Sequence, residues 1–246
     1  MKQFFQRNKR KFRALEYKIT FLELALEAYI SNPKYNYSEE IGFNGQKIRK
    51  NIFTSLVRTI PFDAIIETGT FTGNTTGYMS TVTSLPVYTC ESNRVLHAVA
   101  KSRLKAFSNI YYYLMDSRTF LGTLANSCFD INVPYIYLDA HGYDDLPLYK
   151  EIEIICSYWN EFLIMIDDFQ VPGDTGYGYD TYADNQALSI KKFLSLFEKS
   201  ELAIFFPSAS SGEDSGAKRG CVILTRNTSS ITDQVSKCNL LRQYYS

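Results

Sequence analysis

The feature that most constrains this chain is the regular alternation of short apolar segments with helical segments after residue 60. The strand candidates are 62–67, 86–91, 109–114, 134–139, 161–167, 202–206 and 220–225. Helical patterns lie near 72–83, 93–107, 117–127, 146–158 and 183–199. Continuously apolar strands that alternate with helices indicate an α/β fold, with a mostly parallel sheet covered on both faces. The last two strands have no helix between them, which predicts antiparallel pairing at one edge of a seven-stranded sheet.

The first 60 residues follow a different pattern. Apolar residues at helical spacing predict an amphipathic helix over 11–30 and a second helix that ends before Pro61. We therefore divide the chain into an amino-terminal helical cap, 1–60, and a ligand-binding domain, 61–246. The helices of the cap could pair two subunits in a homodimer.

The distribution of charge argues against a nucleic-acid-binding protein. The formal net charge of the chain is zero, so the molecule as a whole is not built to bind nucleic acid. Residues 1–13 carry six Lys or Arg and no acid, and they could form a solvated helix face or rest on anionic lipid or a partner. Acids at 16, 23 and 27 dilute this charge and favour the solvated face. No apolar run is long enough for a membrane span, which predicts a soluble, cytoplasmic protein without stable membrane insertion.

Acidic side chains stand at or just after the ends of the first five strands. They are Glu67, Glu91, Asp116, Asp139 and the adjacent pair Asp167 and Asp168. In doubly wound sheets, ligands bind beyond the carboxyl ends of the strands, at the point where the strand order reverses. Carboxylates gathered there are costly unless cations or hydrogen-bond donors accompany them. These strand ends therefore predict the functional site.

The turn after the first strand indicates which ligand binds. Its spacing is E-x-G-x-x-x-G, with Glu67 before Gly69 and Gly73 and with Phe71 between the glycines. A carboxylate beside this turn would repel a diphosphate but suits a ligand with a positive end. Glu91 can accept hydrogen bonds from both hydroxyls of a ribose, and Asp116 could take the exocyclic amine of an adenine. A nucleoside with a cationic tail fits these groups, and S-adenosylmethionine is such a molecule.

Five stretches carry a resemblance to a known family: ETGTFTGNT, YTCESN, MDSR, IYLDAH and LIMIDDF. Together they resemble the class I S-adenosylmethionine-dependent methyltransferases over about 62–225. More narrowly, they resemble the metal-dependent O-methyltransferases of the catechol and macrolide-sugar types. The resemblance implies a three-layer, Rossmann-like, doubly wound sheet. It also implies a cofactor site formed by Glu67, Gly69, Thr70, Phe71, Gly73, Thr75, Glu91, Ser92, Asp116, Ser117 and Asp139.

The same resemblance implies a metal site. Asp139, Asp167 and Asp168 match the acids that hold a divalent ion in that family. Three carboxylates in one crevice repel one another unless some are protonated or a cation joins them. Ligation by oxygen alone favours Mg²⁺, with Ca²⁺ or Mn²⁺ as alternatives.

The reaction expected from this site is methyl transfer to a hydroxyl of a small molecule. Gly142 stands where the catechol type has a lysine base, so Asp139 and His141 are the candidates for the catalytic base. A sugar or another natural-product-like acceptor is therefore at least as well favoured as a catechol. Residues 171–184, rich in Gly, Tyr and Asp, could close over the acceptor. Two alternatives stay open: a nicotinamide-dependent oxidoreductase on a similar sheet, and a cofactor-binding module without turnover.

Overall fold

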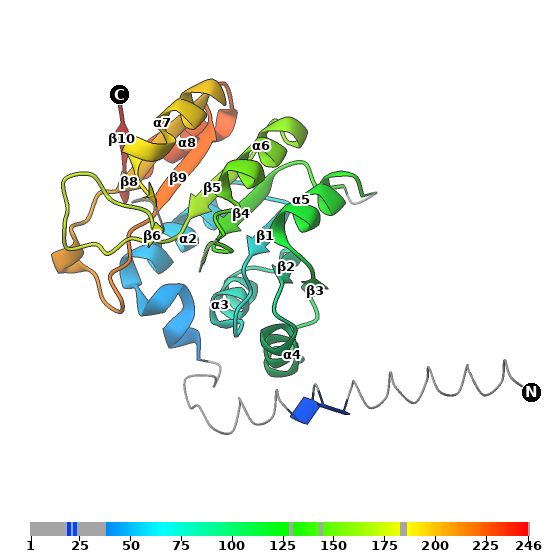
Figure 1. The fold of residues 1–246 in the computed structure, drawn as a ribbon. Helices are drawn as coiled ribbons and strands as arrows, with labels where there is room; N and C mark the ends of the chain where they lie inside the picture. Colours follow the sequence, from blue (N-terminus) through cyan, green and yellow to red (C-terminus); the bar gives the residue numbers. More distant parts are fainter. Residues whose placement is uncertain are drawn as a thin grey trace, which may run out of the picture.

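A central sheet of eight strands, flanked by helices, forms the described part of the protein (Figure 1). The computed structural model describes residues 19–20, 22–23, 38–127, 130–142, 145–182 and 186–245. The strands are β1 (Ala64–Thr68), β2 (Val87–Glu91), β3 (Ile110–Leu114), β4 (Pro134–Leu138), β5 (Leu163–Ile166), β8 (Leu202–Pro207), β9 (Val222–Arg226) and β10 (Leu241–Tyr244), with a separate hairpin of β6 (Thr181–Tyr182) and β7 (Gln186–Ala187). The helices are η2 (Glu39–Gly45), α2 (Lys47–Thr59), α3 (Asn74–Val82), α4 (Arg94–Arg103), α5 (Ser117–Ala125), α6 (Leu148–Tyr158), α7 (Ile190–Lys199), η4 (Ser211–Glu213) and α8 (Ser230–Ser236).

The order of strands confirms the mostly parallel, doubly wound sheet. The order is β10-β8-β9-β5-β4-β1-β2-β3, and β1 to β5 pair in parallel. Strand β9 is antiparallel to both β5 and β8, so the last two predicted strands pair as expected. The predicted count of seven strands was one too low, because β10 adds an antiparallel strand outside β8. The order reverses between β1 and β4, and the site is expected at that point.

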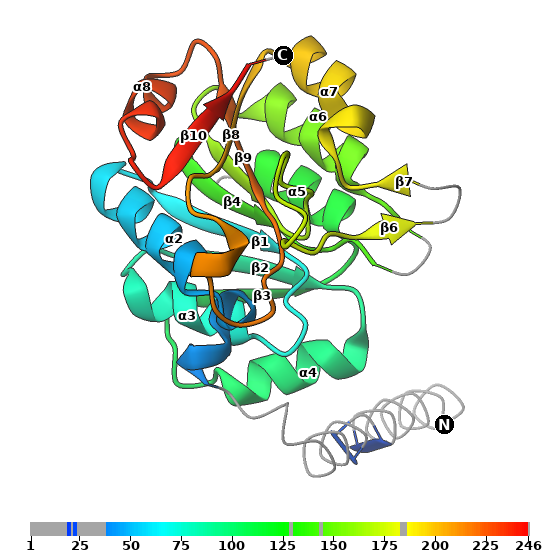
Figure 2. The same ribbon diagram turned by 90° about the vertical axis from the view of Figure 1, so that its left-hand side faces the viewer.

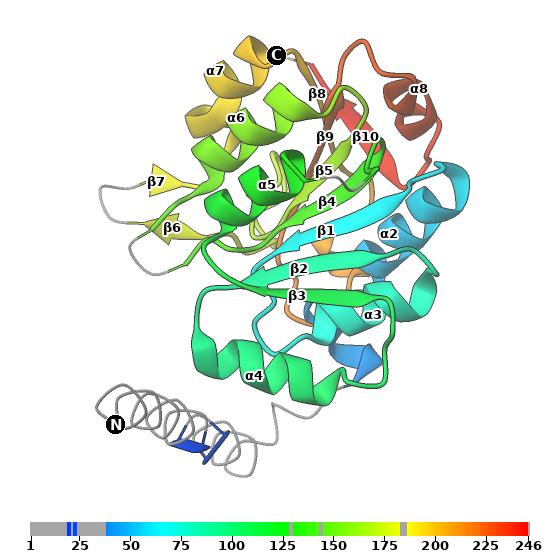
Figure 3. The same cartoon turned by 90° about the vertical axis from the view of Figure 1, so that its right-hand side faces the viewer.

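Helices cover both faces of the sheet, and side chains that alternate along each strand fill two cores (Figures 2 and 3). Ile66 on β1 belongs to the core under α5, α6 and α7, whereas its neighbour Ile65 belongs to the core under α2, α3 and α8. This arrangement is the three-layer packing that the sequence predicted. In the part of the chain described here, no helix is long and apolar enough to cross a bilayer.

The second helix of the predicted cap is integrated into the three-layer body. Ile52, Phe53 and Leu56 of α2 are buried in the same core as the sheet, and the ring of Phe53 lies 5.1 Å from that of Tyr135 on β4. The predicted boundary at residue 60 therefore does not separate two cores among the described residues. Most of the predicted helix over 11–30, and with it the proposed dimer contact, lies outside the described residues.

A fully buried carboxyl group lies on α6. Both oxygens of Glu151 are inaccessible to water and have no hydrogen-bond partner among the described residues. Burial raises the pKa of Glu151 to about 7. An acid whose pKa is raised in the folded state favours folding while it is protonated and loses that advantage as the pH rises through this value.

We expect Glu151→Gln to stabilise the protein in a pH-dependent way. About one pH unit below the ordinary pKa of 4.5, the variant and the parent should be about equally stable, because the carboxyl group is then protonated in both the folded and the unfolded state. Above pH 7 the variant should be more stable by up to about 3 kcal/mol, since each pKa unit corresponds to about 1.4 kcal/mol. Urea unfolding at about pH 3.5 and pH 8 measures the difference. Glu153→Gln, at a half-exposed position on the same helix, is the control for the substitution itself. An equal effect of Glu151→Gln at both pH values would contradict the buried-acid explanation.

Candidate functional site

Two adjoining hollows open at the carboxyl ends of the parallel strands. The larger, of about 970 Å³, is lined by residues that include Glu91, Ser92, Asp116, Ser117 and His141. The smaller, of about 380 Å³, is lined by residues 69–75 together with Ile41 and Asn44. Gly69, Phe71 and Asp139 line both hollows. The predicted site residues that line neither of them are Glu67, Asp167 and Asp168.

The turn between β1 and α3 requires both of its glycines. Gly69 has φ +86°, and a Cβ atom there would lie 2.3 Å from the carbonyl oxygen of Asp139. Gly73 has φ +84°, and its Cβ atom would lie 2.6 Å from a methyl carbon of Leu104. Glycine adopts this left-handed region without steric cost. The turn can therefore pass close against the tip of β4, and Phe71 at its top is 56% exposed.

The side chain of Glu67 supports the turn from beneath and does not face the hollows. Ile65 and Glu67 point to the same face of β1, toward α3. The Glu67 carboxylate accepts hydrogen bonds from Thr76 at 2.5 Å and from Thr89 at 2.6 Å. Burial raises the pKa of Glu67 to about 7, although these two hydroxyls oppose the shift. The prediction that Glu67 faces the positive end of the cofactor is therefore corrected: it holds β1, β2 and α3 together.

Glu91 lies where the ribose-binding carboxylate was predicted, and it also organises the backbone around it. One oxygen accepts the N–H of Phe71 at 2.9 Å, and the other accepts the N–H of Asn93 at 2.8 Å. The residue is 9% exposed and lines the larger hollow. Its position is thus fixed by both the glycine turn and the start of α4.

Asp116 caps α5 and is held in an ion pair at the wall of the larger hollow. It accepts the N–H of Arg118 at 2.9 Å, as an N-cap residue does. The Arg118 guanidinium bridges Asp116, at 2.6 Å, and Asp145, at 2.7 Å. Hydrogen bonds from Arg118 lower the pKa of Asp116 below its usual value. Ser117, the first residue of α5, is buried beside it.

Thr75 lies across the turn, and its hydroxyl accepts the N–H of Phe43 at 3.1 Å.

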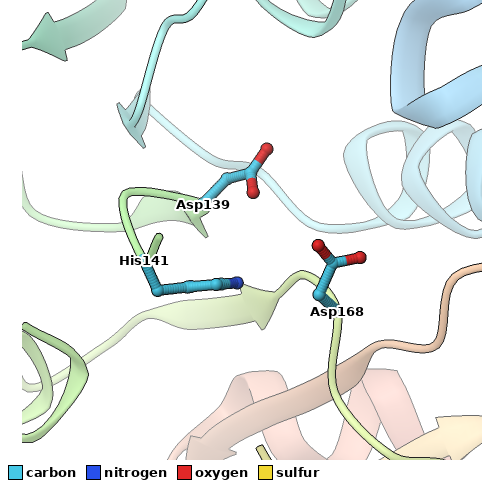
Figure 4. Close-up of side chains that lie close together, drawn as sticks. All are labelled: Asp139, His141 and Asp168. Atoms are coloured by element: carbon cyan, nitrogen blue, oxygen red, sulfur yellow. The ribbon is translucent and has the colours of Figure 1, made fainter. Parts of the chain in front are cut away.

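Asp139, His141 and Asp168 converge on one space beside the hollows (Figure 4). A potential ligand atom of each lies within 4.8 Å of those of the other two. Burial raises the pKa of Asp139 well above its usual value, and the charges of Asp167 and Asp168 raise it further. No hydrogen bond to the Asp139 carboxylate is found among the described residues. In the described part of the chain, Asp139 therefore lies at the hollow without a hydrogen-bond donor, although the charge of Arg49 partly opposes the rise in its pKa.

The structure corrects the predicted role of Asp167, which points away from this group. Its carboxylate forms a buried ion pair with Arg49 of α2, and both side chains are 1% exposed. It also accepts hydrogen bonds from Tyr137 at 2.5 Å, from Asn44 at 3.3 Å and from the N–H of Asp168 at 2.6 Å. Burial opposes ionisation of Asp167, yet Arg49 and Tyr137 lower its pKa below the usual value. Donors from the protein thus occupy the lone pairs that a metal would use.

Asp168, unlike Asp167, is directed toward Asp139 and His141. It adopts a left-handed backbone conformation with φ +52°, which separates its direction from that of Asp167. Its Oδ1 accepts a hydrogen bond from Nε of Arg219 at 2.5 Å, and Arg219 also pairs with Asp180 of the loop after β5. Among the described residues, no hydrogen bond to Oδ2 of Asp168 is found. Burial and the neighbouring Asp167 raise the pKa of Asp168 to about 6.

The charges and the donor atoms around this space fit a divalent cation. Among the described residues, the carboxylates of Asp139, Asp167, Asp168 and Asp180 lie near the guanidinium groups of Arg49 and Arg219. When these four carboxyl groups are ionised, their negative charge exceeds the positive charge of the two guanidinium groups by two. Such an excess of negative charge in a buried site is stabilised by a bound cation.

Solved structures of methyltransferases share this fold at low sequence identity. No family model and no curated protein sequence matches the chain. An O-methyltransferase from Bacillus cereus, in complex with S-adenosylhomocysteine, is 16% identical with a TM-score of 0.57, covering 84% of this chain and 90% of that one. The O-methyltransferase TomG from Streptomyces achromogenes, in complex with S-adenosylmethionine, is 13% identical with a TM-score of 0.53, covering 84% and 88%. The methyltransferase domain of bacterial CtHen1 is 12% identical with a TM-score of 0.52, covering 73% and 97%. The chain therefore has the fold of the class I methyltransferases.

Proposed function

We propose that this protein transfers the methyl group of S-adenosylmethionine to a hydroxyl of a small molecule, with the help of a divalent cation. The observation that carries the proposal is the continuous wall of the larger hollow. The wall runs from Asp116 through Glu91 and the glycine turn to Asp139 and His141. Its groups follow in the order that an adenine, a ribose and a sulfonium-bearing chain require. The shared fold with the two cofactor complexes supports this assignment.

Each part of the wall has a role in the proposed complex. Glu91 accepts hydrogen bonds from the ribose hydroxyls, while Asp116 and Ser117 lie beside the adenine. The backbone from Gly69 to Gly73 lies beside the methionine part, in the left-handed turn that its two glycines permit. Asp139 lines both hollows, so it lies beside the methionine part of the proposed complex.

The transfer forms a bond between the acceptor oxygen and the methyl carbon while the bond from sulfur to that carbon breaks. The acceptor proton must leave, and Asp139 and His141 are the nearby groups that could receive it. A divalent cation bound at this site would stabilise negative charge on the acceptor oxygen. The main contribution of the protein is to hold the two reactants in attack geometry, an effect of roughly 7–11 kcal/mol in well-oriented systems.

Cofactor binding and product release test the proposal. Isothermal calorimetry should detect binding of S-adenosylmethionine, and S-adenosylhomocysteine should be released with a panel of sugar and phenolic hydroxyl acceptors when divalent ions are present.

Glu91→Gln should weaken cofactor binding by about 1.5–3 kcal/mol, because it replaces a charge-assisted acceptor. Glu198→Gln, exposed on α7, is the control and should leave binding unchanged. Binding of NAD without binding of S-adenosylmethionine would instead support the oxidoreductase alternative, and binding without release of product would support the module without turnover.

A further inference from the structure

His141 is a buried side chain whose polar atoms have no partner among the residues that the structure describes. It follows the tip of β4 and is 7% exposed. Neither Nδ1 nor Nε2 has a hydrogen-bond partner in the described part of the chain. A buried donor or acceptor that lacks a partner costs stability, so most such groups in folded proteins are satisfied. The unpaired imidazole therefore indicates a ligand other than the described residues of the chain.

The imidazole is directed at the carboxylates of Asp139 and Asp168 at the strand tips. Figure 4 shows the ring extending into the space between Asp139 and Asp168. The ligand atoms of the three residues lie within 4.8 Å of one another, a spread that one ion can bridge after a small side-chain movement. Arg219 bonds to Oδ1 of Asp168, and no hydrogen bond from the described residues reaches Oδ2. Asp167, by contrast, is already saturated by Arg49, Tyr137 and its other donors.

We propose that Asp139, His141 and Asp168 are the protein ligands of the divalent ion, with His141 in the place that the family pattern gives to Asp167. The inference rests on the proposed function only in expecting a divalent cation at these strand tips. As a ligand, His141 is not the catalytic base. The site then has one nitrogen and two carboxylate donors.

This donor set changes which metal the site prefers. Mg²⁺ is a hard ion that takes oxygen ligands and gives up its water reluctantly. Imidazole nitrogen suits first-row transition metals, whose affinity rises from Mn²⁺ toward Cu²⁺ for a given site. We therefore expect Mn²⁺ and Co²⁺ to bind more tightly than Mg²⁺, in contrast to the preference for Mg²⁺ predicted from a set of three carboxylates.

The chain contains two histidines, His97 and His141, which makes the assignment directly measurable. Electron paramagnetic resonance titration with Mn²⁺ gives the affinity, and electron spin echo modulation detects ¹⁴N of a coordinated imidazole. The parent protein and His97→Gln should both show ¹⁴N coupling and bind Mn²⁺ more tightly than Mg²⁺ in competition. His141→Gln should lose the coupling and bind Mn²⁺ at least about tenfold more weakly.

Any of the following outcomes would contradict the assignment of His141 as a metal ligand. Absence of ¹⁴N coupling in the parent with tight Mn²⁺ binding would mean that oxygen atoms alone hold the ion. Coupling that survives in His141→Gln, tighter binding of Mg²⁺ than of Mn²⁺, or no measurable binding of either ion would also contradict it. The parent and His97→Gln spectra decide the matter even if His141→Gln does not fold. Calorimetry with S-adenosylmethionine on the same samples keeps the two proposals apart, because cofactor binding can fail while the metal site stands.

Discussion

We expect Arg49→Met to destabilise the protein by about 3–5 kcal/mol, the cost of leaving one member of a buried ion pair without its partner. Arg49 and Asp167 are both 1% exposed, so water cannot replace the lost guanidinium. The guanidinium also donates hydrogen bonds to the carbonyl oxygens of Arg219 and Gly220, which would lose these donors as well. For a protein of this size, the melting temperature should fall by roughly 6–20 °C.

The double variant Arg49→Met/Asp167→Asn separates the ion pair from the packing of α2. If the uncompensated charge causes the loss, the amide should recover part of the stability, because it removes the charge and can still accept a hydrogen bond from Tyr137. Arg58→Met, exposed on the same helix, should change stability by less than about 0.5 kcal/mol. Additive losses in the double variant would show that Arg49 and Asp167 do not act as a unit. Thermal and urea unfolding measure these three variants and the single variant Asp167→Asn, which the test of additivity requires.

The general architecture was predictable because the signal for it is local. Each of β1 to β5 is an apolar run that ends near a carboxylate, and helices at regular spacing separate the runs. The strand β10, LRQY, was missed because a short edge strand has no continuous apolar run and pairs with a single neighbour. The hairpin of β6 and β7 is shorter still, and its two-residue strands leave no pattern in the sequence.

The wall of the larger hollow was also predictable, because the topology of a parallel sheet brings strand ends together. The direction of individual side chains was not. The interpretation of Asp167 depended on the family pattern, whereas its partner Arg49 lies 118 residues earlier on a helix assigned to a cap. Arg219, which holds Asp168 and Asp180, comes from the loop before β9 and carries no local signal. Charge compensation across such separations is a property of the folded chain.

Gly69→Ala should reduce turnover in the methyltransferase assay about a hundredfold, the cost of a displacement of about 1 Å in reacting groups. A Cβ atom at this position would lie 2.3 Å from the carbonyl oxygen of Asp139, 2.6 Å from its carbonyl carbon and 2.9 Å from the amide nitrogen of Ala140. These are backbone atoms of the β4 tip, so no side-chain rotation relieves the contact. The residue also has φ +86°, which a residue with a side chain adopts at a cost of about 1–3 kcal/mol.

The expected structural response is a separation of the tips of β1 and β4. The N–H of Asp139 bonds to the carbonyl oxygen of Thr68 at 3.0 Å, so the displacement would pull Asp139 away from His141 and Asp168. Cofactor affinity and turnover should then fall together, because both hollows share Gly69 and Asp139.

Gly122→Ala is the matched control, because a Cβ atom in that part of α5 meets no atom within 4 Å. Alanine is the better helix former, so this variant should gain up to about 1 kcal/mol of stability and keep its activity. The same substitution at two glycines would thus have opposite effects, one set by backbone contact at the site and the other by helix propensity. Full activity of Gly69→Ala would mean that the turn does not determine the position of Asp139, and that the hollow tolerates a wider gap between the strand tips than the structure shows.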